Sequence, residues 1–462
     1  MNKDVNEIIE IINKNNKKAY LVGGAVRDMV LKKEPHDYDI TTNMSYEDLE
    51  KVFPKNYPSG KAFGIITIFY NDNEYEIAHF RNDGDYADNR HCEVILVDSV
   101  EEDLKRRDFT INAIAYNEKE GFIDPFGGKK DVEKKIIRAV GNPNERFNED
   151  ALRMMRAIRF SAQLGFDIEE NTLNAIKNNA HLIKNISFER IEAEMTKILL
   201  SNHPEKIKML YDLGISKYIM PELDEIFECE QNTPWHIYDV GNHTMKALEN
   251  IEKDRILRWS ILFHDFGKPD AKTTKNGIDH FFEHAIIGLE KIENVLNRLK
   301  FSNDDKNKIL NYVEYHDLKL KKTHKIRYMV AKYGFDFFEN LYKIQMADIE
   351  GQSDYKKEEK IENAKRLLED ARVVYEDRTA IKLKDLEING NDLIKLGFKD
   401  IEIGAILNNF YINSLKDPRF NNKNKLIQKA KELKNKSLDD IILEYKKHQK
   451  SSNKFAKNKE ER

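Results

Sequence analysis

The sequence of 462 residues is about three times as long as a typical domain of ~150 residues, so several hydrophobic cores in series are expected. Charged residues make up 34% and the hydrophobic class 40%, as is typical of soluble proteins. No apolar run approaches the roughly 18 residues of a membrane-spanning helix, which argues against a membrane protein. The formal net charge of −4 excludes a protein that coats nucleic acid with its whole surface, but it leaves room for a local basic groove.

The N-terminal part of the chain mixes predicted helices and strands. Residues Met1–Lys18 combine acids with regularly spaced isoleucines, which predicts an amphipathic helix and not a signal peptide. Short β-forming runs follow, bounded by Gly and Asn-Asp turns: Ala19–Val22, Ile65–Tyr70, Tyr75–Phe80 and Val94–Val97. The two cysteines, Cys92 and Cys229, lie far apart, so we expect no disulfide framework and a reducing, cytoplasmic location.

A Gly-Gly turn follows the first predicted strand. Gly23 and Gly24 separate Ala19–Val22 from a predicted helix that contains Arg27. Glycines let the backbone approach a ligand, and the free N–H groups at the start of a helix attract phosphate oxygens. The turn is therefore a candidate phosphate-binding site, with Arg27 as the counter-charge.

Two carboxylates follow this helix. Asp37 and Asp39 are spaced i and i+2, so they share one face if the segment is extended. Paired carboxylates of this kind favour Mg²⁺, and two such ions would activate an attacking hydroxyl and neutralise a leaving pyrophosphate. Glu74 and Glu76 share a face of a later strand, and we choose Glu76 as a third ligand. The alternative for Asp37 and Asp39 is a surface loop with two acids, and the alternative for Glu74 and Glu76 is a solvent-facing position on the strand.

Cations dominate the next two motifs. Arg106–Ala113 contains Arg107 and Asp108, and it offers donors and acceptors for the phosphates and ribose of a nucleotide. Glu149–Phe160 is a predicted apolar helix that carries arginines at every third position, and buried guanidinium groups need partners. The stripe comprises Arg153, Arg156 and Arg159, preceded by Asp150. It predicts a nucleotide pocket, with an intramolecular salt-bridge ladder as the alternative.

Together, these residues resemble the class II tRNA nucleotidyltransferase and bacterial poly(A) polymerase family. The resemblance extends from about Ala19 to Ser201 and rests on four motifs in the family's order and spacing: Leu21–Asp28, Asp37–Asp39, Arg106–Ala113 and Glu149–Phe160. It implies a polymerase-β-like head followed by a helical neck, body and tail. It also implies tRNA, ATP and CTP as partners, with nucleotides added to a 3′ end without a nucleic-acid template.

The resemblance also implies roles for single residues. Gly24 and Arg27 would hold the triphosphate, and Asp37 and Asp39 the magnesium ions. Arg107 would contact the nucleotide, with Asp108 near the ribose. Asp150 and Arg153 would bind the Watson–Crick edge of the incoming base, which suits the exocyclic amine that C and A share. Arg156 and Arg159 would complete the pocket.

Two further segments bear on the choice of product. Gly84–His91 resembles the flexible loop of CCA-adding members, which is shortened in members that add only A, although Cys92 replaces a proline common there. Ile388–Leu393 and Gly404–Leu407 resemble the family's tail, which grips the tRNA elbow. The sequence therefore favours CCA addition, with an A-adding or poly(A)-adding enzyme as the alternative.

Histidines mark a third region. Seven of the thirteen fall between positions 236 and 324, and the motifs containing His243, His264-Asp265, His284, His316 and Asp348 resemble the HD phosphohydrolase signature. The resemblance implies a metal core of His243, His264, Asp265 and Asp348, with His284 and His316 at a second metal or at a phosphate. Imidazole and carboxylate ligands suit a divalent transition metal, whose bound water can attack a phosphoester. A purely structural bundle is the alternative.

The expected fold class is α+β, with a polymerase-β-like head and all-α parts after it. We place the head at residues 1–140, the neck at 141–230, the HD domain at 231–353 and the tRNA-binding body and tail at 354–462, because a charged run from Asp354 to Lys360 suggests a boundary. Two other classes of protein remain open. A nucleotide-signalling synthetase and hydrolase would carry its HD part first, and a non-catalytic RNA-binding protein would not need Asp37 and Asp39.

Overall fold

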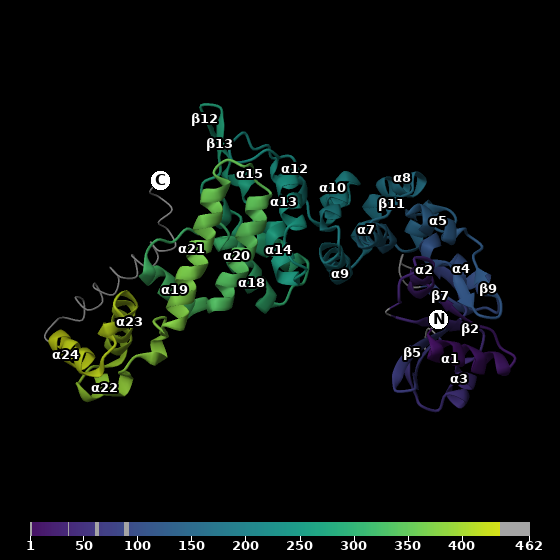
Figure 1. Cartoon of the computed structure of the whole chain (residues 1–462), viewed down its shortest axis with the longest axis horizontal. Helices are drawn as coiled ribbons and strands as arrows, with labels where there is room; N and C mark the ends of the chain where they lie inside the picture. The colour runs from purple at the N-terminus through teal and green to yellow at the C-terminus, as the bar shows by residue number, and fades with distance from the viewer. Residues whose placement is uncertain (1, 36, 61–63, 87–91, 435–462) are drawn as a thin grey trace. The chain divides into compact units, whose positions relative to one another are not determined.

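The computed structural model describes residues 2–35, 37–60, 64–86 and 92–434 (Figure 1). The chain divides into two compact units, which are described separately. The first comprises Met1–Glu225 with Val295–Phe301, and the second comprises Ile226–Asn294 with Ser302–Arg462. No helix of the described residues is both long and apolar enough to cross a membrane.

The first unit begins with a seven-stranded sheet in the order β3-β4-β5-β2-β1-β8-β9. Strand β1 pairs antiparallel with β2 and β8, whereas β2 pairs parallel with β5. The strands are β1 (Ala19–Val22), β2 (Asp39–Thr42), β3 (Asn56–Gly60), β4 (Ile65–Tyr70), β5 (Asn73–His79), β8 (Ala115–Asn117) and β9 (Gly121–Ile123). Asn71 and Asp72 adopt positive φ angles between β4 and β5, as the turn of a tight hairpin requires.

Helices cover this sheet because their apolar faces need burial. The predicted N-terminal helix is α1 (Lys3–Lys14), which buries Val5, Ile8, Ile9 and Ile12 in one core with strand residues such as Leu21 and Ile77. The head also contains α2 (Gly24–Val30), α3 (Tyr46–Val52), α4 (Val100–Lys105) and α5 (Gly128–Lys134). The expected α+β head is confirmed.

A separate hairpin carries the segment that favours CCA addition. Strand β6 (Arg81–Tyr86) pairs antiparallel with β7 (Cys92–Leu96), and Tyr86 lies opposite Cys92. Part of the predicted loop Gly84–His91, residues 87–91, lies outside the described residues, so the interpretation of this loop stays a prediction.

The rest of the first unit is largely helical. Its main helices are α6 (Pro143–Glu149), α7 (Leu152–Leu164), α8 (Glu170–Asn179), α9 (Phe188–Leu199), α10 (Met209–Asp212) and α11 (Ser216–Ile219), followed by α12 (Glu222–Phe227). One short parallel pair, β10 (Ile136–Ile137) with β11 (Asp167–Ile168), was not expected in this region. It connects the end of the predicted head to the segment that follows α7.

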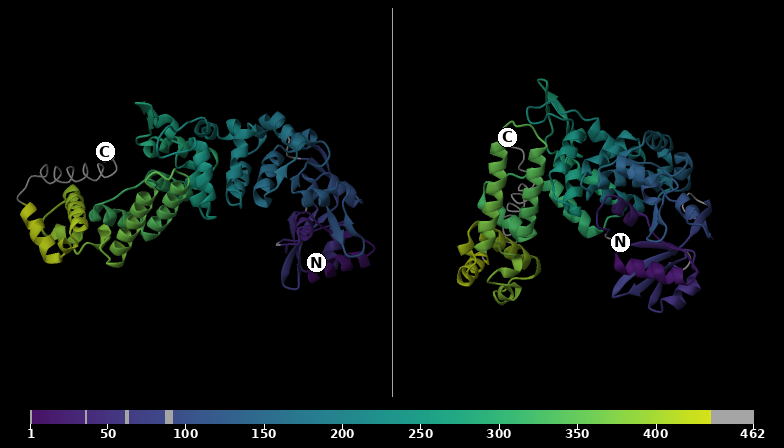
Figure 2. Two further views of the ribbon diagram at one scale, coloured as in Figure 1. Left: turned by 45° about the horizontal axis from the view of Figure 1, so that its top comes forward. Right: turned by 45° about the vertical axis from the view of Figure 1, so that its right-hand side comes forward.

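The second unit is a helical bundle (Figure 2). Its helices are α13 (Val240–Glu249), α14 (Arg255–Phe263), α15 (Lys268–Ala271), α16 (His284–Ile287), α17 (Leu289–Arg298, shared with the first unit), α18 (Asn303–Tyr315), α19 (Thr323–Tyr333), α20 (Phe335–Glu350) and α21 (Lys357–Glu376). A hairpin of β12 (Thr273–Lys275) and β13 (Ile278–His280) interrupts the predicted all-α pattern.

The predicted boundary before residue 354 precedes α21, yet α21 packs against α19 and α20. Its buried Ala364, Leu367, Ala371 and Val374 form one face, and the charged residues occupy the others. The charged run therefore marks the start of another bundle helix. After it, α22 (Gly390–Lys395), α23 (Asp400–Lys416) and α24 (Lys423–Leu433) form a separate small core.

Candidate active sites

The Gly-Gly turn lies beside the predicted catalytic carboxylates. Gly23 adopts a φ of +70°, and a Cβ atom there would lie 3.2 Å from Arg107 Nη1 and 3.7 Å from Asp39 Oδ2. A side chain at this position would be strained by the backbone and crowded by Arg107. The turn thus leaves room at its surface for a ligand, next to a cation and a carboxylate.

Arg27 projects from the first turn of α2 toward the same region. Its Nη1 donates to Asn112 Oδ1 at 2.9 Å, and its Nε and Nη2 donate to Asp28 Oδ1 at 3.0 and 2.9 Å. A Cβ at Gly24 would contact its Nη2 at 3.4 Å. The arginine is therefore held against the turn by an amide and an acid.

Two of the three predicted carboxylates, Asp39 and Glu76, come from neighbouring strands, and Asp37 lies just before β2. Asp39 is the first residue of β2 and lies directly opposite Glu76 of the parallel strand β5, so both side chains share one face of the sheet. Desolvation by the surrounding protein raises the pKa of Asp39, the charge of Asp37 adds to this effect, and Arg107 opposes it. Glu74 accepts a hydrogen bond from Tyr57 Oη at 3.4 Å. The register therefore favours Glu76 over Glu74 as the third ligand.

Asp103, which the sequence analysis did not single out, organises the Arg-Arg-Asp motif. This fully buried carboxylate accepts from Arg106 Nη2 at 2.8 Å and from Arg107 Nη2 at 3.2 Å. Burial works against ionisation, but the two arginines hold the pKa of Asp103 below its usual value. Asp103 thus keeps Arg107 at the mouth of the site.

The arginine stripe on α7 is fully occupied by acids. Arg156 Nε donates to Asp108 Oδ2 at 2.7 Å, and Arg159 Nε donates to Glu194 Oε2 at 2.6 Å. Arg153 pairs with Glu149. The salt-bridge ladder that the sequence left as an alternative is therefore present, and the nucleotide-binding role of these arginines stays a prediction.

Asp150, the predicted base-selecting acid, is also held in place. It lies between α6 and α7, where one oxygen accepts from Leu152 N at 3.0 Å and the other from Arg190 Nη2 at 2.8 Å. Arg190 and Glu194 both project from α9, and neither was predicted. The only sequence signal for them is the charged face of that helix, Phe188–Leu199.

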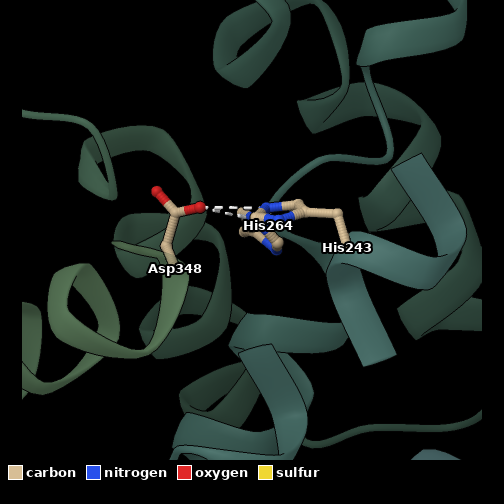
Figure 3. Close-up of side chains that lie close together, drawn as sticks. All are labelled: His243, His264 and Asp348. Carbon is tan, nitrogen blue, oxygen red and sulfur yellow. Dashed lines mark hydrogen bonds and ion pairs between the residues drawn. The ribbon is translucent and has the colours of Figure 1, made fainter. Parts of the chain in front are cut away.

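In the second unit, all six predicted HD residues come together. His243, His264 and Asp348 form one group (Figure 3): His243 Nε2 lies 3.0 Å from Asp348 Oδ1 and 3.2 Å from His264 Nε2. Asp265, His284 and His316 form the second group, with His284 Nε2 3.2 Å from Asp265 Oδ1. Asp265 Oδ2 lies 3.1 Å from His264 Nε2, so this carboxylate joins the two groups.

Backbone carbonyls orient each of these imidazoles. The Nδ1 atoms of the four histidines lie 2.7 to 2.9 Å from carbonyl oxygens of Gly351, Ile261, Phe281 and Val313. A neutral imidazole that donates through Nδ1 has its lone pair on Nε2, and in each case Nε2 faces the cluster. Four imidazole nitrogens and several carboxylate oxygens therefore converge on one region, and this set of donors fits divalent cations.

The two buried carboxylates of the cluster have lowered pKa values. Burial disfavours ionisation of Asp265, yet His264 and Lys268 hold its pKa well below the usual value. Asp348 is likewise buried, and its contacts with His243 and His264 keep its pKa well below the usual value. The site therefore maintains two buried carboxylates in the charged state.

A cavity of about 460 Å³ opens onto the cluster. Its walls include Asp265, His284, His316 and Asp348, together with aromatic side chains and lysines. A volume of this size falls within the usual range for organic ligands. The HD cluster is thus accessible to a molecule considerably larger than a phosphate ion.

Known proteins match each part of the chain. Residues 19–138 match the family described as poly A polymerase head domain, residues 165–227 the probable RNA and SrmB-binding site of polymerase A, and residues 235–372 the HD domain. A CCA-adding enzyme of Ligilactobacillus salivarius is 35% identical over 388 residues, which cover 79% of this chain and 96% of that protein. One of Geobacillus thermodenitrificans is 41% identical over 57% of this chain and 63% of its own length.

Solved structures of CCA-adding enzymes also match this chain. The structure of a Bacillus stearothermophilus CCA-adding enzyme in complex with CTP has a TM-score of 0.68 at 26% identity, and the match covers 94% of this chain and 98% of that one. A Thermotoga maritima CCA-adding enzyme in complex with tRNA shares the fold, with a TM-score of 0.53 at 20% identity over 93% and 95% of the two chains. The resemblance found in the sequence is confirmed: the chain belongs to the family of CCA-adding enzymes, which are tRNA nucleotidyltransferases, and it carries an HD domain in the same polypeptide.

Proposed function

We propose that this chain adds CCA to the 3′ end of tRNA from CTP and ATP without a nucleic-acid template. The observation that carries the proposal is the register of β2 and β5, which sets Asp39 beside Glu76 on the face next to the Gly-Gly turn. In the reaction, the 3′-hydroxyl oxygen of the tRNA forms a bond to the α-phosphorus of the nucleotide. The bond from that phosphorus to the β-phosphate oxygen breaks, and pyrophosphate leaves.

Asp37, Asp39 and Glu76 supply the hard oxygen ligands that Mg²⁺ prefers. Bound there, magnesium lowers the barrier to the attack of the hydroxyl and neutralises charge on the leaving pyrophosphate. Around this centre, the N–H groups that follow Gly23 and the guanidinium groups of Arg27 and Arg107 bind the triphosphate oxygens. Asp108 contacts the ribose once its bond to Arg156 is exchanged for the nucleotide.

Asp150 and Arg153 select the base. The carboxylate accepts from the exocyclic amine of C or A, and the guanidinium donates to ring acceptors. Arg190 fixes the Asp150 carboxylate before the base arrives, and Arg156 and Arg159 line the same pocket. U and G offer the opposite pattern of donors and acceptors at this edge, so both are poor substrates.

The HD cluster acts as a second, separate active site that hydrolyses phosphoesters. Four imidazole Nε2 atoms and the carboxylates of Asp265 and Asp348 suit a divalent transition metal, whose role when bound is to supply an acidified water. Lys268, with Nζ 2.7 Å from Asp265 Oδ2, offsets part of the negative charge where a phosphate would approach.

The alternative within the family is an A-adding or poly(A)-adding enzyme, which the loop at Gly84–His91 disfavours. A non-catalytic RNA-binding protein, the alternative of another class, would not place Asp39 and Glu76 side by side.

One experiment separates these possibilities. The purified protein is incubated with tRNAs that end at the discriminator base, at C and at CC, with CTP or ATP supplied separately. We expect two C additions and then one A. If the tRNA ending in CC gains A while the shorter ones gain nothing from CTP, the enzyme is A-adding. If no tRNA is extended, the proposal fails.

A further inference from the structure

The cavity beside the HD cluster has aromatic walls in addition to its charged residues. Trp235 lines it, together with Phe281, Phe282 and the imidazole of His280. The rings of His280 and Phe282 stack at 5.3 Å with an interplanar angle of 6°. Aromatic surfaces next to a charged centre are suited to a ligand that carries both a phosphate and an aromatic ring.

Trp235 is held rigidly at this wall. Its carbonyl oxygen accepts from Ser353 N at 2.9 Å, and Tyr355 packs against its ring at a centroid distance of 4.6 Å. The residue nevertheless remains 38% exposed. A fixed and accessible indole ring is a surface on which a nucleobase can stack with little loss of conformational entropy.

Lys360 links this ring to the metal-ligand cluster. Its Nζ lies 4.9 Å from the centre of the Trp235 ring and donates to Gln352 Oε1 at 2.7 Å. Gln352 Nε2 in turn donates to Asp348 Oδ1 at 2.9 Å. A short chain of contacts therefore runs from the aromatic wall to a predicted metal ligand, with a cation between them.

We propose that Trp235 and Lys360 form a subsite that selects nucleoside phosphates for the HD centre, with the base on Trp235 and the phosphate between Lys360 and the cluster. This inference rests on the proposed phosphohydrolase function of the same site. In the hydrolysis of such an ester, a water oxygen forms the new bond to phosphorus and the bond from phosphorus to the ribose oxygen breaks. The released hydroxyl takes up a proton, and inorganic phosphate leaves. The substrate is either a free nucleotide or the phosphorylated end of an RNA.

The chain offers a direct reporter for the first step. It contains two tryptophans, and Trp259 is fully buried, so the solvent-accessible fluorescence comes from Trp235. The full-length protein is titrated in Mg²⁺ buffer with adenosine 2′-monophosphate, with a short RNA ending in a 3′-phosphate and with ribose 5-phosphate, which lacks a base. We expect the first or second ligand, or both, to quench the signal and ribose 5-phosphate to leave it unchanged. Trp235→Phe assigns the quenched component and corrects for absorption by adenine.

Variants test the two residues separately. Trp235→Ala is expected to raise the KM for the nucleoside phosphate roughly 5- to 100-fold, the range measured for loss of base stacking, with little change for ribose 5-phosphate. Lys360→Gln is expected to weaken nucleotide binding about tenfold, as for loss of a charged hydrogen bond. Lys357→Gln is the matched control, because this lysine lies one turn earlier on α21 and pairs with Glu350 instead of lining the cavity.

The outcomes are distinct. Equal binding of ribose 5-phosphate and the nucleotide overturns the subsite, as does an unchanged KM ratio in Trp235→Ala. Quenching by the RNA alone identifies an RNA end as the source of the ligand. If wild-type protein hydrolyses no phosphoester at all, the proposed HD function fails, and the fluorescence titration still decides whether the subsite exists.

Discussion

The two candidate sites collect charged side chains in opposite ways. On α7, three arginines each find an acid within the protein: Glu149, Asp108 or Glu194. In the HD cluster, imidazole nitrogens and carboxylates face one another, and Lys268 is the cation that contacts the central Asp265. The arginines of α7 therefore have partners within the protein, and a nucleotide predicted to bind there would have to replace one of them. The converging ligand atoms of the HD cluster form a candidate site for a divalent cation.

The largest effect is expected at the paired carboxylates of the head. Asp37→Ala or Asp39→Ala removes a metal ligand, which is worth several kcal/mol of transition-state stabilisation, so nucleotide addition should fall by at least about a thousandfold. Binding of tRNA should persist, since no phosphate-binding cation is lost. Primer extension and a filter-binding assay measure the two quantities. Glu76→Gln should follow the same pattern and Glu74→Gln should not, which would identify the third ligand.

The HD cluster should respond independently of the head. His264→Ala or Asp265→Ala removes a ligand atom from the centre, and we expect metal-dependent hydrolysis, for example of 2′,3′-cyclic phosphate ends, to fall about a hundredfold or more. The bound metal, measured by elemental analysis, should fall as well, and nucleotide addition should stay near the wild-type rate. Loss of both activities in a folded variant would contradict two separate sites.

A smaller effect is expected at Asp150, the predicted base-selecting acid, and at its partner Arg190. Asp150→Ala should reduce the preference for CTP and ATP over UTP and GTP by roughly ten- to a hundredfold, the cost of an unsatisfied hydrogen-bonding partner. Arg190→Ala should have a similar but weaker effect, because Asp150 keeps its bond to Leu152 N but loses the one that fixes its second oxygen. Arg190→Lys should restore part of the preference. If Arg190→Ala lowers the rate with all four nucleotides equally, Arg190 does not position the base-selecting acid.

The smallest expected effect is on the pH dependence of stability. Burial works against ionisation of Asp108, but Arg156 holds the pKa of this carboxyl below its ordinary value. A carboxyl with a lowered pKa in the folded state stabilises the protein above its unfolded pKa, and this contribution is lost as the pH falls through the folded pKa. The wild type should therefore lose stability below about pH 4. Arg156→Met should be less stable at pH 7, and its melting temperature should fall less on acidification than that of the wild type. If both proteins lose the same stability in acid, the Asp108–Arg156 pair does not contribute.

Local sequence was sufficient for the parts of each site that lie within one segment. The strand, the Gly-Gly turn and α2 follow one another directly, so the candidate phosphate-binding turn is encoded between Ala19 and Val30. Asp37 and Asp39 are two residues apart, so their spacing alone predicts a common side wherever the chain is extended, and in the structure β2 begins at Asp39. The candidate HD ligands were singled out through the family resemblance, and the structure brings them together in two groups.

Long-range contacts could not be inferred in this way. The partner of Asp150 is 40 residues away and that of Arg159 is 35 residues away, and both lie on α9. The packing of α21 against α19 and α20 could not be predicted either, because a charged run marks a helix start and a linker equally well. Trp235 and Lys360 are brought together only when α21 packs against α20.

By itself, the sequence determined the α+β head and the helical architecture after it, and it singled out the candidate ligand residues of the head and of the HD cluster, because these depend on backbone periodicity and on residue chemistry at short spacing. The tertiary structure decided which acid neutralises each arginine, that Glu76 lies beside Asp39, and that an indole ring and a lysine stand at the entrance to the HD centre. Those relations depend on strand register and helix packing between distant segments, for which one sequence carries no local signal.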